Sequence, residues 1–383
     1  MKILITTGSF YPAQEGGPTN ALYWLASGLA HRGYDVHVVA SSKGLSGQVP
    51  LDTWQELNGF RVIYNSPGKG EDILHAEIGW SECLIRSGVC VMKAHLSNLK
   101  YLKRRKKLIL SPRGEVFYPA IFHKGKIFGL LKFVFFKIMG LLYGNRIIYH
   151  ATSEEEKEQI QKIFGRKRRI FTAPNYMIIP DYIDDSLRTD EYKDLIYVGR
   201  IAPIKALDKL IKALSLSKAF LNNSSKLHIL GECNGDYYDY LTQKIDQLNL
   251  KNKVVFHGVV TGRDKDLLIA NSRYLMLISE SENFGNVVIE ALSQGTPVIA
   301  SKGTPWSELE DKDAGFWVSN KPEELSVVID KVLQMDEEQY NTLRRNAYQY
   351  SKMFDVYSNM EVWSSIIDCL HNSASAIIQL PIA

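Results

Sequence analysis

The first forty residues alternate between a strand-like apolar run and an amphipathic helix. Residues 3–7 predict a buried strand, and apolar side chains then recur every three or four residues after Pro18, which suits a first helical position. His31, Arg32 and Gly33 supply the cations and the glycine that close such a helix. Residues 35–40 predict the next strand, so the chain opens with a β-α-β unit.

The same alternation continues in two blocks. Further strands are predicted at 61–64, 107–110 and 146–150, and Ser153 with Glu156 three residues later predicts a capping box at a helix start. After residue 194 the pattern restarts, with strands predicted at 195–198, 227–230, 254–256, 274–278 and 297–300. Two consecutive β/α runs indicate an α/β chain with two Rossmann-like parallel-sheet domains.

Length supports this division, because 383 residues exceed what one core usually organises. We expect an N-terminal domain over 1–173, a link over the acidic, proline-containing segment 174–194, and a C-terminal domain over 195–355. A helix at about 356–383 is expected to pack back on the first domain. Since parallel sheets bind ligands outside the carboxyl ends of their strands, the two domains should face each other across a cleft that holds the working site.

Composition excludes several classes of protein. Hydrophobic residues make up 45% and charged residues 23%, as in an ordinary globular chain and unlike a disordered or collagen-like one. The four cysteines lack the spacing of a zinc site. No run approaches the ~18 apolar residues of a membrane span, and the first strand begins directly after Lys2, so we expect no signal peptide and a cytoplasmic location.

Charge is distributed unevenly along the chain. The net charge is +4, but Lys100–Arg146 holds twelve Lys and Arg and one acid, Glu115. Within it, lysines are interspersed with Phe and Leu over 126–139, a composition typical of surfaces that meet anionic lipid headgroups. We therefore expect a peripheral protein on the inner face of the cell membrane. The alternative is that Phe133, Phe135 and Phe136 are core and the lysines a solvated rim. No nucleic-acid module appears, so no nucleic-acid partner is expected.

The segment 279–290 follows an apolar strand and carries two glutamates. Glu282 precedes the predicted helix and Glu290 lies inside it, about 12 Å further along if all eight residues were helical. That is too far for the carboxylate pair of a retaining glycosidase, but it suits the two ends of one long ligand. Backbone N–H groups at the helix start offer a phosphate site; they belong to Gly285, Asn286 and Val287. The alternative is an acid near a helix dipole and a solvated glutamate.

Two cations follow the first strand of the second block. Arg200 and Lys205 lie five residues apart just after that strand, where they would neutralise a diphosphate; the alternative is two surface cations. In the first block, Gly16 and Gly17 precede the first helix and allow a ligand to approach the backbone. Neither a Gly-x-Gly-x-x-Gly nor a Gly-Lys-Ser/Thr motif is present, which disfavours a dehydrogenase or a P-loop enzyme.

Two Asp-x-Asp patterns are candidates for a divalent ion. They are Asp264-Lys-Asp266 and Asp311-Lys-Asp313. Both lie among basic residues, and we interpret them as solvated surface. With Arg200 and Lys205 supplying positive charge, no metal and no cofactor are expected.

In their order and spacing these residues resemble the retaining nucleotide-sugar glycosyltransferases of family 4, which have the two-domain GT-B fold. Further motifs carry the resemblance: Leu29-Ala-His-Arg-Gly33, Ser111-Pro-Arg-Gly-Glu115, Ala151-Thr-Ser-Glu154, Pro174-Asn175, Leu230-Gly231, Phe256-His-Gly258 and Glu-x-Phe-Gly-x-x-x-x-Glu-Ala-Leu from Glu282. The resemblance covers nearly the whole chain.

The resemblance implies roles for particular residues. Arg200 and Lys205 would hold the donor diphosphate and stabilise the leaving group, Glu282 would contact the donor sugar, and Glu290 would bond the ribose. The remaining donor-binding positions would be Gly16, Gly17, Asn283, Phe284, Gly285, Asn286 and Val287. The reaction would retain the anomeric configuration, with the leaving phosphate helping to deprotonate the acceptor hydroxyl.

One motif departs from the common family pattern. Many relatives read Pro-His-Gly where this chain has Pro112-Arg113-Gly114, so Arg113 is a candidate sugar or phosphate contact. His75 is a candidate for a second family histidine, although a lone histidine there is more often structural. A subset of bacterial surface-polysaccharide enzymes is similar, which implies sugar transfer from a nucleoside-diphosphate donor to a lipid-linked saccharide in O-antigen or capsule synthesis. The alternatives are a non-catalytic sugar-nucleotide-binding relative and a GT-B nucleotide-sugar epimerase.

Overall fold

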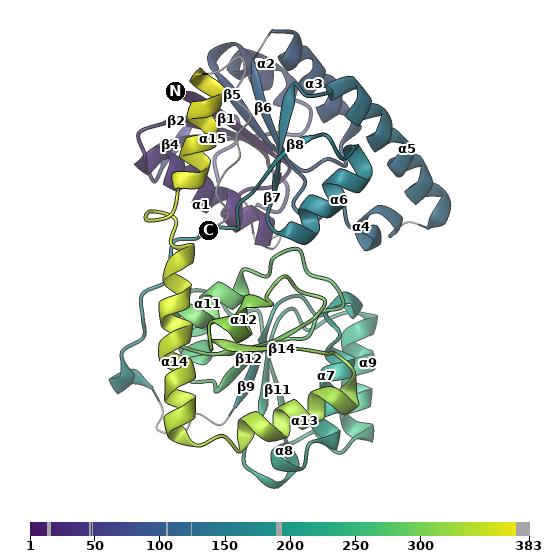
Figure 1. Ribbon diagram of the computed structural model, residues 1–383, viewed down its shortest axis with the longest axis vertical. Coiled ribbons are helices and arrows are strands. Elements are labelled where there is room, and N and C mark those ends of the chain that lie inside the picture. The colour runs from purple at the N-terminus through teal and green to yellow at the C-terminus, as the bar shows by residue number, and fades with distance from the viewer. Residues whose placement is uncertain are drawn as a thin grey trace. The chain divides into compact units, whose positions relative to one another are not determined.

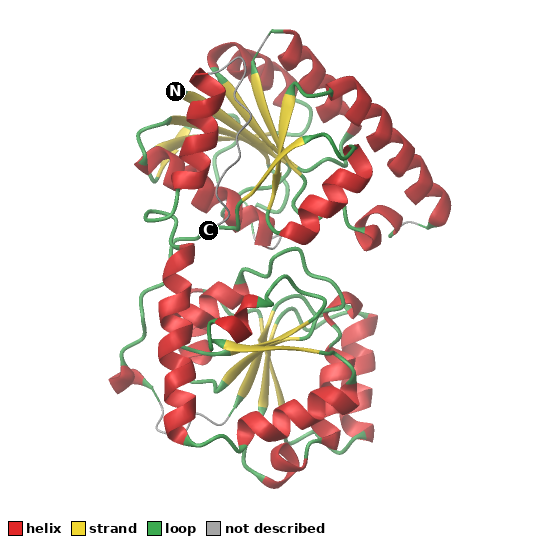
Figure 2. Cartoon of the chain, viewed as in Figure 1, coloured by secondary structure: helices red, strands yellow, loops and turns green. Residues whose placement is uncertain are grey.

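The computed structural model describes residues 1–13, 17–45, 47, 49–104, 106–123, 125–188 and 194–372. The chain divides into an N-terminal unit, Met1–Ile178 together with the chain from Val356 onward, and a C-terminal unit, Ile179–Asp355. Each unit is a sheet covered by helices on both faces (Figure 1, Figure 2). The predicted α/β class with two parallel-sheet domains is confirmed.

The N-terminal unit has an eight-stranded sheet of order β3-β4-β2-β1-β5-β6-β7-β8, in which only the β3–β4 pair is antiparallel among the described strands. Its strands are β1 (Lys2–Thr7), β2 (Asp35–Ser41), β3 (Gln55–Leu57), β4 (Phe60–Asn65), β5 (Cys83–Ser87), β6 (Lys107–Ser111), β7 (Ile147–Ala151) and β8 (Arg169–Thr172). Its helices are α1 (Gly17–His31), α2 (Gly70–Trp80), α3 (Met92–Lys103), α4 (Tyr118–Phe122), α5 (Lys126–Tyr143), α6 (Glu154–Phe164) and α15 (Glu361–Asn372). The sequence pattern missed β5, where the buried Arg86 interrupts the apolar run and donates to Asn98 Oδ1 at 2.6 Å.

The C-terminal unit has a six-stranded parallel sheet of order β11-β10-β9-β12-β13-β14. Its strands are β9 (Leu195–Val198), β10 (Leu227–Leu230), β11 (Val254–Gly258), β12 (Tyr274–Leu277), β13 (Val298–Ser301) and β14 (Gly315–Val318). Its helices are α7 (Leu207–Leu216), α8 (Lys218–Asn222), α9 (Asp236–Gln247), α10 (Gly262–Ala270), α11 (Val287–Ser293), α12 (Glu308–Asp311), α13 (Pro322–Leu333) and α14 (Glu337–Ser351). Three short 3-10 turns accompany them: η1 (Asp185–Leu187), η2 (Pro203–Lys205) and η3 (Lys352–Phe354).

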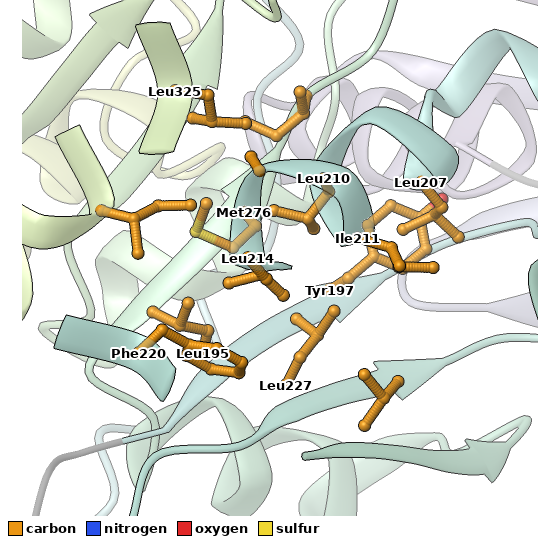
Figure 3. Close-up of a cluster of buried hydrophobic side chains, with 14 of the residues drawn as sticks. Leu195, Tyr197, Leu207, Leu210, Ile211, Leu214, Phe220, Leu227, Met276 and Leu325 are labelled. Atoms are coloured by element: carbon orange, nitrogen blue, oxygen red, sulfur yellow. The ribbon is translucent and has the colours of Figure 1, made fainter. Parts of the chain in front are cut away.

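The core of the C-terminal unit explains why α7 forms directly after η2. Leu210, Ile211 and Leu214 recur at helical spacing and are fully buried against the sheet, where they gather over Tyr197 and Leu227 (Figure 3). Fully burying a leucine or isoleucine contributes about 1.5–3 kcal/mol. This packing fixes α7 and therefore the position of η2, which directly precedes it.

The division at Ile178/Ile179 falls inside the segment 174–194 that the sequence predicts as the link. The described part of this segment after Ile178 is attached to the C-terminal unit. The N–H of Ile183 donates to Gln294 Oε1 at 2.9 Å, and the Arg188 guanidinium donates to the carbonyl oxygens of Ile183, Ala270 and Gln294. Arg188 therefore satisfies the carboxyl-terminal ends of α10 and α11, which have no partners within their own helices.

The helix α15 packs on the N-terminal unit. The N–H of Val356 donates to the Met177 carbonyl at 2.9 Å, so the two chain segments at the unit boundary are bonded to each other. Trp363 is buried between His150 and Phe171, with ring centroids 4.7 and 5.0 Å away. The C-terminal helix thus completes the core of the N-terminal unit.

Candidate functional site

Two loops of the C-terminal unit meet at the carboxyl edge of its sheet. One follows β9 and contains η2, and the other follows β12 and runs from Ser279 to the start of α11. Because β9 and β12 are neighbouring parallel strands, both loops leave the sheet at the same edge. They are joined directly, since the N–H of Glu280 donates to the Ile204 carbonyl at 2.9 Å.

This junction brings Lys205 and Glu282 together. The Lys205 ammonium donates to Glu282 Oε2, and the two side chains are only 14% and 16% exposed. A second pair lies beside it, with Lys209 Nζ 2.5 Å from Glu280 Oε1 on a more exposed part of the loop. An ammonium group has three donors, so Lys205 can hold Glu282 and still donate to a bound anion.

Glu290 of α11 has its own cation. Lys265 Nζ of α10 lies 2.9 Å from Glu290 Oε2, and both side chains are largely buried. Burial raises the pKa of the neighbouring Asp266, and the charge of Glu290 adds to that rise. Asp264 is exposed, as predicted from the sequence, whereas Lys265 and Asp266 are partly buried beside Glu290. The sequence pattern did not single out Lys265.

Phe284 and Gly285 shape the turn between the two glutamates. The Phe284 ring is buried against Trp306 and Phe354, at centroid distances of 5.1 and 6.2 Å, and its carbonyl accepts a hydrogen bond from Trp306 Nε1. Gly285 has a φ of +82°, and a Cβ there would lie 3.0 Å from the Leu277 side chain. Phe284 therefore anchors the loop, and Gly285 allows it to turn into α11.

Two buried polar atoms of the same loop lack a hydrogen-bond partner in the structure. They are Ser279 Oγ and Asn283 Oδ1. Buried polar atoms are normally bonded, so this loop retains capacity for a ligand or water. Among the residues that the structure describes, no three His, Cys, Asp or Glu side chains gather as a metal site requires.

The remaining predicted positions of this unit lie on the same two loops. Arg200 is exposed after β9, and its carbonyl accepts a hydrogen bond from the Tyr197 hydroxyl at 2.7 Å. Asn286 and Val287 are partly buried at the start of α11. Backbone N–H groups at a helix start suit an anion, although here the Val288 N–H already donates to the Gly285 carbonyl at 2.9 Å.

In the N-terminal unit, Arg113 is turned into the protein. It is 8% exposed, has a φ of +50°, and donates from Nη1 to Asn175 Oδ1 at 2.8 Å. Burial lowers its pKa to about 10, an effect that the charge of Glu156 opposes. Arg113 also lines a cavity of about 10 Å³, enough for one water molecule. The predicted sugar or phosphate contact would require its guanidinium to leave this position.

The Ser111–Glu115 motif binds neighbouring loops together. Glu156 accepts from the N–H of Gly114 at 2.6 Å and from the N–H and hydroxyl of Thr152 at 2.8 Å each. Glu115 accepts from the N–H groups of Val89 and Cys90. Only half of the predicted capping box forms: the Ser153 hydroxyl caps the Glu156 N–H at 3.2 Å, but the Glu156 carboxylate turns to Gly114 and Thr152. The loops after β5, β6 and β7 are thereby fixed to one another.

Three predicted residues remain. His75 lies on an exposed part of α2, and Gly17 is the exposed first residue of α1. Gly16 lies outside the described residues.

His150 provides a pH-dependent test of the N-terminal unit. The His150 side chain is buried. Its Nδ1 lies 2.7 Å from Ser111 Oγ, and its Nε2 lies 2.9 Å from the Ala173 carbonyl oxygen. Because a carbonyl can only accept, Nε2 carries the proton and Nδ1 accepts from the Ser111 hydroxyl. Burial, with Arg113 adding to it, lowers the pKa of His150 to about 3.

We expect the neutral His150 to make stability fall as pH falls. Between about pH 6.5 and pH 3 the unfolded chain binds a proton at this position and the folded chain does not, which costs about 1.4 kcal/mol per pH unit. His150→Gln retains a donor and an acceptor without titrating, so its unfolding free energy should decline less steeply in this range. Denaturant melts at several pH values measure the difference, with the exposed His123→Gln as control. Equal slopes for His150→Gln and the native chain would contradict a buried neutral histidine.

Comparison with known proteins finds a family that matches the C-terminal unit. Residues 179–350 match the family described as glycosyl transferases group 1. The chain is 34% identical over 146 residues to an uncharacterized glycosyltransferase of Methanocaldococcus jannaschii, covering 38% of this chain and 36% of that protein. The match thus spans little more than a third of that curated relative's length.

Solved structures extend the likeness to both units. Alr3699/HepE of Anabaena in complex with UDP-glucose superposes with a TM-score of 0.71 at 21% identity, over 96% of this chain and 100% of that one. WaaG, a glycosyltransferase involved in lipopolysaccharide biosynthesis, gives a TM-score of 0.65 at 17% identity, over 95% and 99% of the two chains. At these identities the likeness establishes the fold. The chain therefore has the GT-B fold, and its C-terminal unit matches the family of group 1 glycosyltransferases.

Proposed function

We propose that the protein is a retaining glycosyltransferase that moves a sugar from a nucleoside-diphosphate donor to a lipid-linked saccharide in surface polysaccharide synthesis. The observation that carries this proposal is the half-buried Lys205–Glu282 pair at the carboxyl edge of the C-terminal sheet. It places a cation and a hydroxyl-binding carboxylate side by side, as a sugar diphosphate requires. The complex of HepE with UDP-glucose and the role of WaaG in lipopolysaccharide biosynthesis support the choice of donor and pathway.

The chemistry needs stabilisation of a departing diphosphate. Lys205 and Arg200 would neutralise its developing charge, and Lys205 would exchange part of its bond with Glu282 for the phosphate oxygens. Glu282, released from that bond, would accept from a hydroxyl of the donor sugar. With the anomeric configuration retained, the leaving phosphate would take the proton of the acceptor hydroxyl on the same face. The two cations Lys205 and Arg200 would match the diphosphate charge, so the proposed reaction is independent of metal.

The nucleoside end of the donor would lie at Glu290. Its carboxylate would accept from the ribose hydroxyls, and the ion pair with Lys265 at 2.9 Å orients that carboxylate. Asn286 and Val287 at the start of α11 lie between the two glutamates and would donate backbone N–H groups to the phosphates.

Glu290→Ala is expected to raise the donor KM roughly tenfold with kcat changed less than about twofold. The lost ribose bonds act equally in the ground and transition states, which makes them uniform binding. Steady-state kinetics test this, and the affinities of UDP and 2′-deoxy-UDP supply a second measurement. The native protein should prefer UDP, and Glu290→Ala should bind both equally. A loss of kcat alone, or an unchanged preference for UDP, would contradict ribose binding.

The basic segment Lys100–Arg146 lies in the N-terminal unit and is our candidate for the contact with the membrane that carries the acceptor. We propose that this segment holds the protein at the anionic inner face of the membrane, where a lipid-linked acceptor is found, with no nucleic-acid partner. The support is its excess of eleven positive charges, twelve Lys and Arg against one acid. None of the helices in the described ranges has the length and apolar character of a membrane-spanning segment.

A direct assay tests the proposed function. Purified protein is incubated with a panel of radiolabelled nucleotide sugars and an extract of lipid-linked saccharides, and the product is analysed by NMR for its anomeric configuration. Transfer with the configuration of the donor retained is the expected result. Binding without turnover would identify a non-catalytic relative, and interconversion of the nucleotide sugar without an acceptor would identify an epimerase; either result overturns the proposal.

A further inference from the structure

The outward face of α5 is apolar. Seven large aliphatic side chains of this helix are between 47% and 78% exposed: Ile127, Leu130, Leu131, Val134, Ile138, Leu141 and Leu142. At 3.6 residues per turn they fall within about a third of the helix circumference, over a length of about 22 Å. Figure 1 shows α5 at the outer edge of the N-terminal unit, next to α4 and α6.

The opposite face of α5 makes the usual contacts with the core. Phe136, Met139 and Tyr143 are buried in the core of the N-terminal unit. Gly140 lies directly against the backbone of Phe164 in α6, where a Cβ would be only 2.9 Å from the carbonyl oxygen. The helix is therefore apolar on both sides, whereas a helix between core and water normally presents polar residues outward. A continuous exposed aliphatic stripe of this kind marks a surface that meets an apolar partner.

Positive charge borders the stripe. Lys126 is exposed at the start of the helix, and the ammonium groups of Lys132 and Lys137 donate to the carbonyls of Ala120 and Lys162 at its flanks. No Asp or Glu occurs from residue 116 to residue 153. On the adjacent α6, the exposed Glu154 and Glu158 are paired with Lys157 and Lys162.

We propose that the outward face of α5 inserts in the plane of an anionic bilayer, with its aliphatic side chains below the headgroups and its lysines among the phosphates. An apolar face bordered by cations and lacking acids matches this environment. Three lysines along the helix prevent it from crossing the bilayer, so it lies on the surface. Tyr118 of α4, 65% exposed and stacked on Phe122, adds an aromatic side chain suited to the interface.

This inference deepens the proposed function, on which it rests for the lipid-linked acceptor. The broad basic segment would attract the protein to the membrane, and α5 would fix which side of the N-terminal unit faces it. A purely electrostatic attachment is lost in salt, whereas buried aliphatic side chains hold at high salt. The two contributions are therefore separable by experiment.

The test is flotation of the full-length protein with phosphatidylcholine vesicles that contain 30% phosphatidylglycerol or none. Leu131→Gln with Leu141→Gln removes two aliphatic contacts at the centre and end of the stripe and should lower partitioning onto the anionic vesicles roughly tenfold or more. The conservative pair Leu131→Met with Leu141→Met should retain binding. Leu221→Gln with Val327→Gln, at exposed aliphatic positions on α8 and α13, is the matched control and should bind as the native protein does.

Lys126→Gln separates charge from insertion. It should lower binding to anionic vesicles about fivefold, the effect of one cation near the surface, and leave binding to neutral vesicles unchanged. Unchanged flotation of the Leu131→Gln/Leu141→Gln variant would overturn the inference. A native dimer in light scattering without lipid that the same variant dissociates would also overturn it, because a second copy would then cover the face.

UDP binding, followed by thermal shift, distinguishes this inference from the proposed function. If the Leu131→Gln/Leu141→Gln variant binds UDP normally and fails to float, the inference holds. If the native protein floats but no nucleotide sugar is bound or transferred, the proposed function fails and membrane docking through α5 stands.

Discussion

Replacing Lys205 with alanine is expected to lower kcat by about 10²- to 10³-fold with the fold intact. One well-aimed charge at a developing anion contributes about 3–4 kcal/mol to transition-state stabilisation. Lys205 is the cation that the structure holds in the half-buried junction of the β9 and β12 loops, where its interaction is screened less than at the surface. Single-turnover kinetics with saturating donor measure the change, and thermal melts of the free protein verify folding.

Lys209→Ala is the matched control for this experiment. Lys209 lies four residues further along the chain, in α7, and pairs with Glu280 of the β12 loop at 2.5 Å, but the two side chains are 34% and 42% exposed. Exposed ion pairs contribute about 0–1 kcal/mol, so turnover should change less than about threefold. Equal losses for the two alanine variants would contradict a leaving-group role for Lys205, because the effect would then come from general charge on the loop.

The meeting of Lys205 with Glu282 could be predicted from the sequence, and the reason is topological. Both follow strands of one parallel sheet, and the carboxyl ends of such strands share an edge. The partner of Glu290 could not be predicted in the same way. Lys265 lies 25 residues earlier on α10, and its pairing depends on how α10 packs beside α11. The local pattern around it, two aspartates among basic residues, is equally typical of solvated surface.

The burial of Arg113 also could not be predicted from its motif. Its place after β6 suggested a ligand contact, yet the structure buries it against Asn175 and within the field of Glu156. The sequence gives no sign of this, because Asn175 and Glu156 come from loops and helices 43 or more residues away. The side chain of Phe284 behaves similarly: its motif suggests donor binding, and its ring lies in an aromatic cluster with Trp306 and Phe354.

The core interpretation of the 126–139 stretch is confirmed for its aromatic side chains Phe133, Phe135 and Phe136. Phe136 is core, and Phe133 and Phe135 are partly buried against it, as the core interpretation expected. The exposed apolar side chains of the helix are mainly Ile, Leu and Val, together with Phe128, which is 59% exposed. Since α5 carries apolar residues on both its inward and its outward face, hydrophobic periodicity cannot tell which side packs inward. Gly129 and Gly140 could have, because small residues mark the side where Phe122 and Phe164 approach closely.

Glu156→Ala is expected to cause the largest loss of stability, about 3–5 kcal/mol in the N-terminal unit. The carboxylate is buried and accepts from Gly114 and twice from Thr152, so its removal leaves three donors unsatisfied. It also leaves the buried Arg113 without the charge that opposes its desolvation. Calorimetry is the suitable measurement, because the two units can unfold separately and only one transition should move, by about 10 °C.

Glu154→Ala separates this effect from the general loss of an acid on α6. Glu154 lies in the same first turn, is exposed and forms a surface ion pair with Lys157, so its removal should cost less than about 0.5 kcal/mol. A double-mutant cycle with Arg113→Met isolates the electrostatic part. If Glu156 stabilises Arg113, the double variant should lose less than the sum of the two single losses, by about 1 kcal/mol or more. Additive losses would mean that Glu156 stabilises the unit only through its hydrogen bonds to Gly114 and Thr152. The coupling free energy between Glu156 and the Arg113 charge would then be zero.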